Sequence, residues 1–310
     1  AGFNPDRQFA PGQLRLQELQ RDYFYTQIDE KTEVYAVVGD PIAHSLSPAI
    51  HNTAFRQLGL NKVLLPLRVQ DGKLEETLDN LAWLQIKAFA VTIPHKESVI
   101  KLLDKVDGAV ERTGSCNTVV VENDKWTGYN TDYRAAMDSL EAALGGPVAP
   151  DVSPLLNKQV LVLGAGGVAR SVAFGLARRG AGVILCNRSE ERAIRLAEEV
   201  GCRTVDWAMR GGTMADVVIN CTPVGMHPDV DETPIPPAGF KPGMLAFDMV
   251  YHPENTMFLK LARERDCTGL SGVDMFVRQA AIQFKQFTGE EPPVDEMRAV
   301  IKRKLGPLGE

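Results

Sequence analysis

The sequence lacks any apolar run near the roughly 20 residues that cross a bilayer, and its first 20 residues lack the apolar stretch of a secretory signal. We therefore expect no membrane span and no signal peptide, and we predict a cytoplasmic protein (plastid if the source is a plant). An excess of basic residues is also missing: 34 Lys and Arg stand against 40 Asp and Glu, a net charge of −6. Because nucleic-acid binding needs a basic surface, we expect no nucleic-acid partner.

A cysteine framework is absent as well. The five cysteines are an odd number, lie far apart and include no Cys-x-x-Cys pair: Cys116, Cys186, Cys202, Cys221 and Cys267. This spacing argues against a disulfide scaffold and against a zinc site. We expect free thiols and no bound metal.

What is present is an ordinary globular composition, with 44% hydrophobic and 24% charged residues in a chain of 310. That length suggests two domains. Residues 1–32 are mostly polar and are interpreted as a lead-in segment. Short apolar runs then alternate with helical patterns, which predicts βαβ units and mostly parallel sheets.

The predicted strands are 34–38, 63–69, 88–93, 160–163, 183–186, 217–220 and 245–247, with a hairpin at 117–122 and 125–128. The predicted helices begin at Ser47 and at 94–96, or span 74–84, 132–144, 167–179, 189–200, 273–287 and 294–304. The segment 223–243 holds six prolines and is expected to be a loop.

The strongest local motif is Gly-x-Gly-x-x-Ala, directly after an apolar strand and at the start of a helix. Gly164 allows the tight turn, Gly166 lets the backbone approach a pyrophosphate, and Ala169 lets the helix pack closely on the strand. Gly167, at the start of that helix, is also expected to bind the cofactor. The N–H groups of the helix N-terminus then face the phosphates. The motif predicts a dinucleotide-binding domain, although a glycine turn in a non-binding α/β fold would look the same.

The end of the next strand favours NADP over NAD. NAD sites usually carry an acidic residue about 20 residues after the glycines, whereas Asn187 is neutral. Arg188 offers a planar fork of donors for a 2′-phosphate, and Ser189 adds a hydroxyl. Arg192, one helical turn further, adds charge or simply belongs to a solvated helix face.

The Gly- and Pro-rich stretch 145–154 suggests a domain boundary. The predicted fold class is α/β with two domains: an N-terminal α/β substrate-binding domain, residues 33–145 plus 276–310, and a Rossmann-type dinucleotide-binding domain, residues 146–275. We expect the active site in the cleft between them, with closure of the cleft as a hinge motion.

Four polar clusters precede the glycine motif, at residues 44–48, 92–96, 116–118 and 128–132. Taken alone each has a plain structural interpretation. Ser47 suits a helix N-cap, with Pro48 at the first helical position, and Asp132 suits another N-cap. A lone Lys such as Lys96 is usually solvated. The same clusters also suit a site for a carboxylate and for acid–base chemistry.

Together, in this order, the clusters resemble the shikimate dehydrogenase family, over residues 34–304. The similar segments are 39–48, 91–96, 117–118, 130–132, 164–169, 187–189, 220–226, 248–251 and 279–281. The resemblance implies reversible NADP-dependent reduction of 3-dehydroshikimate to shikimate, a step of chorismate and aromatic amino-acid biosynthesis.

The family's roles transfer to matching residues. Lys96 and Asp132 resemble the catalytic pair, with Lys96 as the general acid–base; His95 is the weaker candidate. The residues that resemble substrate contacts are Ser45 and Ser47 for the carboxylate, Thr92, Asn117 and Gln279 for the ring hydroxyls, and Tyr251. Thr222 and Met226 resemble the loop that approaches the nicotinamide.

Two positions depart from the family pattern: residue 90 is Ala where Asn is usual, and residue 133 is Tyr where Gly is usual. Both are expected to reshape the pocket. Residues 10–13, Ala-Pro-Gly-Gln, resemble the end of the substrate loop of a type I 3-dehydroquinate dehydratase. This implies a native fusion to a dehydratase domain. The barrel that carries the dehydratase lysine is absent, so we expect no dehydratase activity here.

Two alternatives remain open at this point. One is a quinate or quinate/shikimate dehydrogenase that uses NAD or NADP, which Ser45, Ser47 and Arg188 disfavour. The other belongs to a different class, a non-catalytic sensor or repressor module of the same fold. Retention of both Lys96 and Asp132 disfavours the second.

Overall fold

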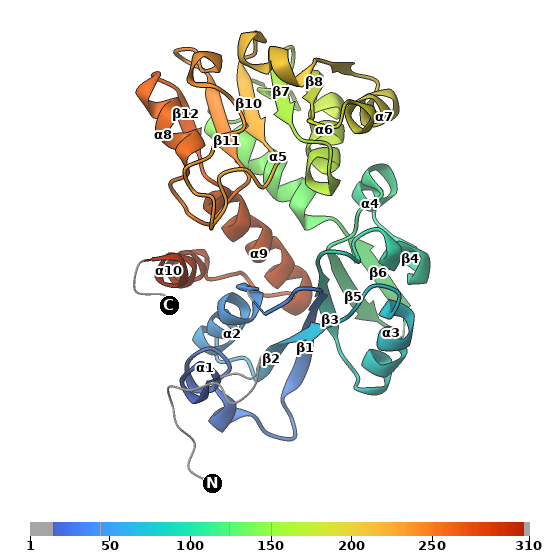
Figure 1. The fold of residues 1–310 in the computed structure, drawn as a ribbon. Helices are drawn as coiled ribbons and strands as arrows, with labels where there is room; N and C mark the ends of the chain where they lie inside the picture. Colours follow the sequence, from blue (N-terminus) through green and yellow to red (C-terminus); the bar gives the residue numbers. More distant parts are fainter. Residues whose placement is uncertain (1–14, 44, 124, 150, 307–310) are drawn as a thin grey trace. The chain divides into compact units, whose positions relative to one another are not determined.

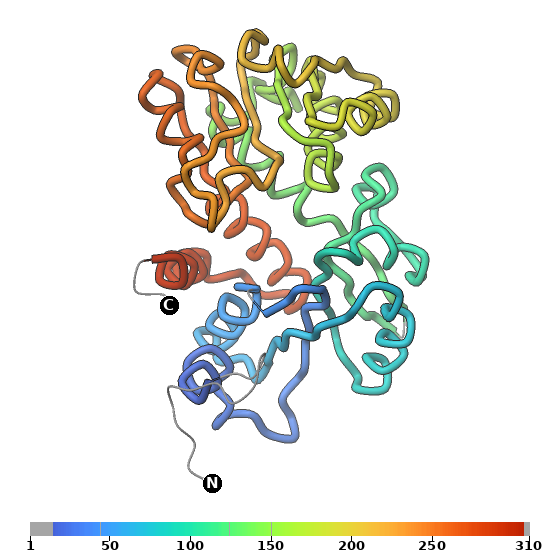
Figure 2. The backbone as a smooth tube through the Cα atoms, in the orientation of Figure 1, coloured from blue at the N-terminus to red at the C-terminus, as the bar shows by residue number. Residues whose placement is uncertain are grey.

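The computed structural model describes residues 15–306 apart from residues 44, 124 and 150, so the segment 10–13 lies outside the described residues. The chain divides into two compact units, the first made of residues 1–131 and 280–310 and the second of residues 132–279. Figure 2 follows the backbone through the first unit, into the second and back again. The first unit is therefore built from two separate stretches of chain.

The first unit contains a six-stranded mixed sheet (Figure 1). Its strands are β1 (Glu33–Gly39), β2 (Lys62–Arg68), β3 (Ala88–Val91), β4 (Lys105–Val106), β5 (Thr118–Glu122) and β6 (Lys125–Tyr129), in the order β2-β1-β3-β5-β6-β4. β1 pairs in parallel with β2 and β3, whereas β5 is antiparallel to both β3 and β6. The predicted hairpin is confirmed, and it makes this sheet mixed.

The helices of this unit are α1 (Leu16–Arg21), α2 (Ser47–Gln57), α3 (Leu74–Trp83), α4 (Gly108–Thr113) and α10 (Val294–Leu305), with short 3-10 helices at Tyr25–Gln27 and Ser98–Leu102. The helix α2 packs against β2, and α10 packs against α2. The described part of the lead-in is fastened to α10 because the Lys304 ammonium lies 2.5 Å from the Asp22 carboxylate.

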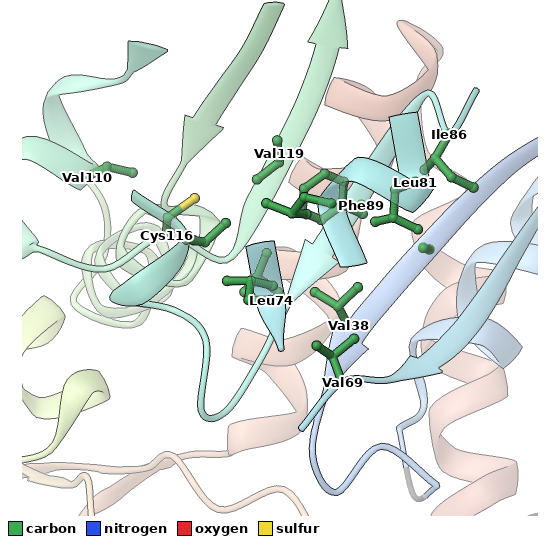
Figure 3. Packing of buried hydrophobic residues seen from close by; sticks show 13 residues of the cluster. Val38, Val69, Leu74, Leu81, Ile86, Phe89, Val110, Cys116 and Val119 are labelled. Carbon is green, nitrogen blue, oxygen red and sulfur yellow. The ribbon is translucent and has the colours of Figure 1, made fainter. Parts of the chain in front are cut away.

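The hydrophobic core on the α3 face shows why α3 is a helix. Leu74, Leu78 and Leu81 recur at helical spacing and are all buried. Figure 3 shows the core cluster to which they belong, with Phe89 of β3 and Val119 of β5, which are both fully buried. Each such side chain contributes about 1.5–3 kcal/mol on burial. The core therefore fixes β3 and β5 side by side, and the polar clusters 92–96 and 116–118 lie at the end of β3 and at the start of β5.

The helix predicted to start at 94–96 is wrong, and the preceding strand ends at Val91. A turn follows, and then the 3-10 helix Ser98–Leu102. The reason is that the Lys96 carbonyl accepts the Cys116 N–H at 2.8 Å and so gives no α-helical bond. At the other predicted start, the sequence predicts Ser47 as the N-cap and Pro48 as the first helical residue. The helix begins one residue earlier, at Ser47, with Leu46 as the N-cap.

The second unit contains a six-stranded sheet whose strand pairs are all parallel. The strands are β7 (Gln159–Leu163), β8 (Gly182–Cys186), β9 (Arg203–Thr204), β10 (Val217–Asn220), β11 (Leu245–Asp248) and β12 (Thr268–Leu270). Their order, β12-β11-β10-β7-β8-β9, is the doubly wound order of Rossmann domains. The predicted dinucleotide-binding fold is confirmed.

The helices of the second unit are α5 (Thr131–Ala143), α6 (Gly167–Arg178), α7 (Glu190–Val200), α8 (Met257–Glu264) and α9 (Gly272–Thr288), with 3-10 helices at Trp207–Gly212 and Pro237–Gly239. α5 starts on the last residue of the first unit, and α9 leads back into it. Glu141 of α5 accepts a hydrogen bond from Arg179, just after α6, at 2.7 Å. Across the described ranges, no helix is both long and apolar enough to cross a bilayer.

Candidate active site

The glycine loop follows β7, and its first glycine is required by the fold. Gly164 has φ +116°, a conformation that other residues rarely adopt. A Cβ at this position would lie 2.9 Å from the Cys221 carbonyl oxygen. The Gly164 N–H donates to the Cys186 carbonyl at 2.7 Å. Gly164 therefore lets the chain turn where three neighbouring strands end.

The fold leaves open space beside the next two glycines, Gly166 and Gly167. α6 begins at Gly167 with Gly166 as the N-cap, and a Cβ on either would meet nothing within 4 Å. Ala169 is fully buried, as close packing of α6 on the strand requires. The open space thus lies in front of a helix N-terminus, where N–H groups and the helix dipole attract anions. These residues fit the pyrophosphate of a dinucleotide.

The proposed 2′-phosphate residues follow β8. Asn187 donates from Nδ2 to the Ser189 carbonyl at 2.9 Å, which closes the turn before α7. Ser189 is the N-cap of α7, and Arg188 and Arg192 are exposed on the same segment. The structure therefore groups these four residues at the carboxyl end of the strand beside the glycine loop.

Two further loops leave the carboxyl edge of the same sheet. The loop after β10 carries Thr222 and the half-exposed Met226. The loop after β11 carries Tyr251, whose ring stacks on Phe276 at 4.9 Å between centroids. Gln279 is buried on α9, with 7% of its surface exposed.

In the first unit, the end of β3 and the start of β5 bring three predicted residues together. The Val91 N–H donates to the Asn117 carbonyl at 2.8 Å, and the Cys116 N–H donates to the Lys96 carbonyl at 2.8 Å. Thr92, Lys96 and Asn117 thus lie on adjacent backbone segments. His95 is fully buried, with Nε2 2.6 Å from the Val69 carbonyl oxygen. This structural role agrees with the prediction that His95 is a weaker candidate than Lys96 for the general acid–base.

The serine loop follows the end of β1. The Ser47 N–H lies 3.3 Å from Ser45 Oγ, to which it donates, at the first turn of α2. Both serines are partly exposed. Their hydroxyls and the N-terminal N–H groups of α2 together suit a carboxylate.

A buried hydrogen-bond network that the sequence did not reveal supports Asn117. Its Oδ1 accepts the Thr131 N–H at 2.8 Å, and its Nδ2 donates to Thr131 Oγ1 at 2.9 Å. Gln283 donates from Nε2 to Thr118 Oγ1 at 2.7 Å. Thr131 directly precedes Asp132, so the network fixes the start of α5. The available signal was the position of Gln283 one helical turn after Gln279.

Tyr133, the departure next to Asp132, has its hydroxyl 3.5 Å from Nη1 of Arg179. The structure thus groups Ser45, Ser47, Thr92, Lys96 and Asn117 in the first unit, and the remaining predicted residues in the second. The pairing of Lys96 with Asp132 stays a prediction. Among the described residues, no group of three or more His, Cys, Asp or Glu side chains is arranged to hold a metal.

The doubly wound sheet and its open glycine loop define a dinucleotide-binding protein of the dehydrogenase type. Three family models match the chain: "Shikimate dehydrogenase substrate binding domain" at residues 37–119, "Shikimate / quinate 5-dehydrogenase" at 148–228, and "Shikimate 5'-dehydrogenase C-terminal domain" at 272–302. A shikimate dehydrogenase (NADP(+)) of Moorella thermoacetica is 42% identical over 291 residues, or 90% of this chain and 96% of the relative. The chain belongs to the shikimate dehydrogenase family.

Two other relatives bear on substrate and architecture. The crystal structure of the shikimate 5-dehydrogenase of Thermus thermophilus, in complex with NADP(H) and shikimate, matches with a TM-score of 0.78 at 34% identity, covering 88% of this chain and 99% of that one. The bifunctional 3-dehydroquinate dehydratase/shikimate dehydrogenase of Arabidopsis thaliana is 37% identical over 92% of this chain, which spans 48% of that relative.

Proposed function

We propose that the protein is an oxidoreductase that interconverts 3-dehydroshikimate and shikimate with NADP. One observation carries the proposal. An open glycine loop at Gly166 follows β7 in the same chain as the Thr92, Lys96 and Asn117 cluster, which lies where β3 ends and the antiparallel β5 begins. The carboxyl ends of the parallel strands are where α/β sheets bind ligands. The names of the relatives agree with this activity.

Bound NADP supplies the hydride acceptor in the oxidation of shikimate. In that direction the C–H bond of the alcohol carbon releases a hydride and the hydroxyl releases a proton, which the Lys96 amine takes up. In reduction the Lys96 ammonium returns the proton to the carbonyl oxygen. Asp132 orients Lys96 and offsets its charge.

The other site residues hold and orient the two reactants. Ser45 and Ser47 bind the substrate carboxylate, whereas Thr92, Asn117 and Gln279 bind the ring hydroxyls and Tyr251 lines the site. For the cofactor, Gly164, Gly166, Gly167 and Ala169 form the pyrophosphate loop, Asn187, Arg188, Ser189 and Arg192 bind the 2′-phosphate, and Thr222 and Met226 lie beside the nicotinamide.

The test is NADPH formation, followed by its absorbance, with shikimate and with quinate, each in the presence of NADP and of NAD. We expect strong turnover only with shikimate and NADP. Preference for quinate would contradict the substrate assignment and favour the quinate enzyme that one family description also names. A folded protein that binds NADP without turnover would instead favour the non-catalytic sensor.

Arg188→Leu is expected to raise KM for NADP by roughly 10–100-fold and to leave KM for NAD nearly unchanged, because a hydrogen bond to a charged group contributes about 1.5–3 kcal/mol. Arg195→Leu is the matched control, since Arg195 is also exposed but lies farther along α7. Equal KM changes for NADP and NAD would contradict a 2′-phosphate role for Arg188.

For the architecture, we propose a substrate domain of residues 33–145 plus 276–310 and an NADP domain of residues 146–275. A native fusion to a dehydratase domain, suggested by residues 10–13, is supported by the bifunctional relative. The cytoplasmic location stays a prediction.

A further inference from the structure

The two loops that carry Thr222, Met226 and Tyr251 leave adjacent strands, and the last residues of those strands are Asn220 and Asp248. These two residues are paired in register and both are fully buried. Asn220 donates from Nδ2 to Asp248 Oδ1 at 2.9 Å. A side-chain hydrogen bond therefore directly joins the two strand ends from which the loops start.

Asn220 also closes the first loop. Its Oδ1 accepts the Thr222 N–H at 2.9 Å and the Thr222 hydroxyl at 2.6 Å, and its Nδ2 donates to the Val224 carbonyl at 3.1 Å. With the bond to Asp248, the amide uses both its donor hydrogens and its acceptor. The direction of the Thr222 hydroxyl is fixed as a result.

Asp248 does the same for the second loop. Its Oδ1 accepts the Val250 N–H at 3.0 Å, and its Oδ2 accepts the Thr256 hydroxyl at 2.6 Å. Thr256 is the N-cap of α8. The carboxylate thus hydrogen-bonds to Val250 and to Thr256, on either side of Tyr251 in the sequence.

The loops are joined a second time farther out. The His227 N–H donates to the His252 carbonyl at 3.0 Å, and the two imidazole rings stack 5.3 Å apart with only 7° between their planes. The two loops are therefore in contact at a second point, beyond the Asn220–Asp248 hydrogen bond.

We propose that Asn220 and Asp248 are a positioning pair. Together they hold the loop after β10, which carries Thr222 and Met226, and the loop after β11, which carries Tyr251, in one fixed arrangement. The inference rests on the proposed function, which assigns Thr222 and Met226 to the nicotinamide and Tyr251 to the substrate. A misplacement of about 1 Å at a reacting centre can lower a rate by about 100-fold, so we expect loss of the pair to lower kcat.

The groups that donate to Asp248 are all neutral, and its burial raises the pKa of its carboxyl to about 6. Packing alone does not call for a carboxylate in such a place.

The experiment compares Asn220→Ala, Asp248→Ala and Asp248→Asn with the wild type. Calorimetry gives Kd for NADP and for adenosine 2′,5′-bisphosphate, which lacks the nicotinamide, and steady-state assays give kcat. We expect both Ala variants to lose about 10-fold or more in kcat and in NADP affinity, while Kd for the bisphosphate stays within about twofold. Asp248→Asn keeps the shape and one acceptor oxygen, so it should recover most of the loss.

The matched control is Asp216→Ala. Asp216 accepts the Gln159 N–H at 2.7 Å just before β10, at the opposite edge of the same sheet. We expect it to lower Tm without the kcat effect, with all assays run well below each variant's Tm. If Asn220→Ala and Asp248→Ala change only Tm, as Asp216→Ala does, the pair is structural and the inference is wrong.

Failure of the proposed function has a different signature. A wild type that does not oxidise shikimate with NADP would overturn that function without any reference to the variants. In that case the ratio of NADP to bisphosphate affinity still tests the pair, because binding needs no turnover. Should one Ala variant not fold, the other Ala variant decides by the same comparison of kcat and the two Kd values. A large loss in Asp248→Asn would contradict the hydrogen-bonded geometry in either case.

Discussion

Lys96→Met is expected to lower kcat for shikimate oxidation by about 10²–10⁴-fold, because a positioned general acid–base contributes a factor of that size. Methionine has a similar length and keeps the apolar contacts of the stem, but it cannot carry the proton. Kd for NADP should stay the same, since the proposed cofactor residues lie elsewhere in the chain. Steady-state kinetics and calorimetry measure the two quantities separately.

The control for this variant is Lys101→Met, which removes another lysine a few residues along the chain. Lys101 is exposed in the 3-10 helix after the Lys96 turn, so its loss should leave kcat nearly unchanged. Near-full kcat in Lys96→Met would refute the proton-transfer role. In that event His95 gains nothing, because its ring is buried against the Val69 carbonyl.

The second sheet was predictable because short apolar runs and helical patterns alternate with little interruption there. The strand at 217–220 was predicted to the residue, and β7, β8 and β11 within one residue at each end. Two-residue strands such as Arg203–Thr204 were missed, since so short a segment has no measurable period.

The candidate site was predictable only in part, for a related reason. Residues required by an unusual backbone conformation, such as Gly164, can be recognised from a short sequence motif. The Gln283 network does not, because its members lie up to 166 residues apart in the sequence and meet only through the fold. The failed helix at 94–96 has the same origin, since a backbone bond from Cys116 replaced the local one.

Asn220 and Asp248 are an intermediate case. Both belong to segments that resemble the family, but the sequence assigned roles only to their neighbours Thr222, Met226 and Tyr251. Side-chain bonds between adjacent strands depend on register, which a single sequence does not give. The structure supplies the register and with it the reason why these two buried polar residues end their strands.

Gly166→Val is expected to weaken NADP binding by about 100-fold or more while changing Tm by no more than about 4 °C. The fold leaves open space at this position, with φ −89° and ψ −174°, which a β-branched residue adopts without strain. In the proposed function the same space is where the pyrophosphate approaches the α6 N-terminus, so we expect the added side chain to displace the ligand and not the protein. Calorimetry with NADP and thermal unfolding check the two halves of this prediction.

Gly164→Val provides the contrast, because the protein itself fills the space there. Its positive φ and the nearby Cys221 carbonyl predict a loss of about 2–6 kcal/mol in the free energy of unfolding, the sum of backbone strain and overpacking. On the proposed function, the space at Gly166 serves the cofactor, whereas Gly164 is required by the fold. If Gly166→Val bound NADP as tightly as the wild type, the loop would not be the pyrophosphate site. If it lowered Tm as much as Gly164→Val, the premise that the fold leaves this position open would be wrong.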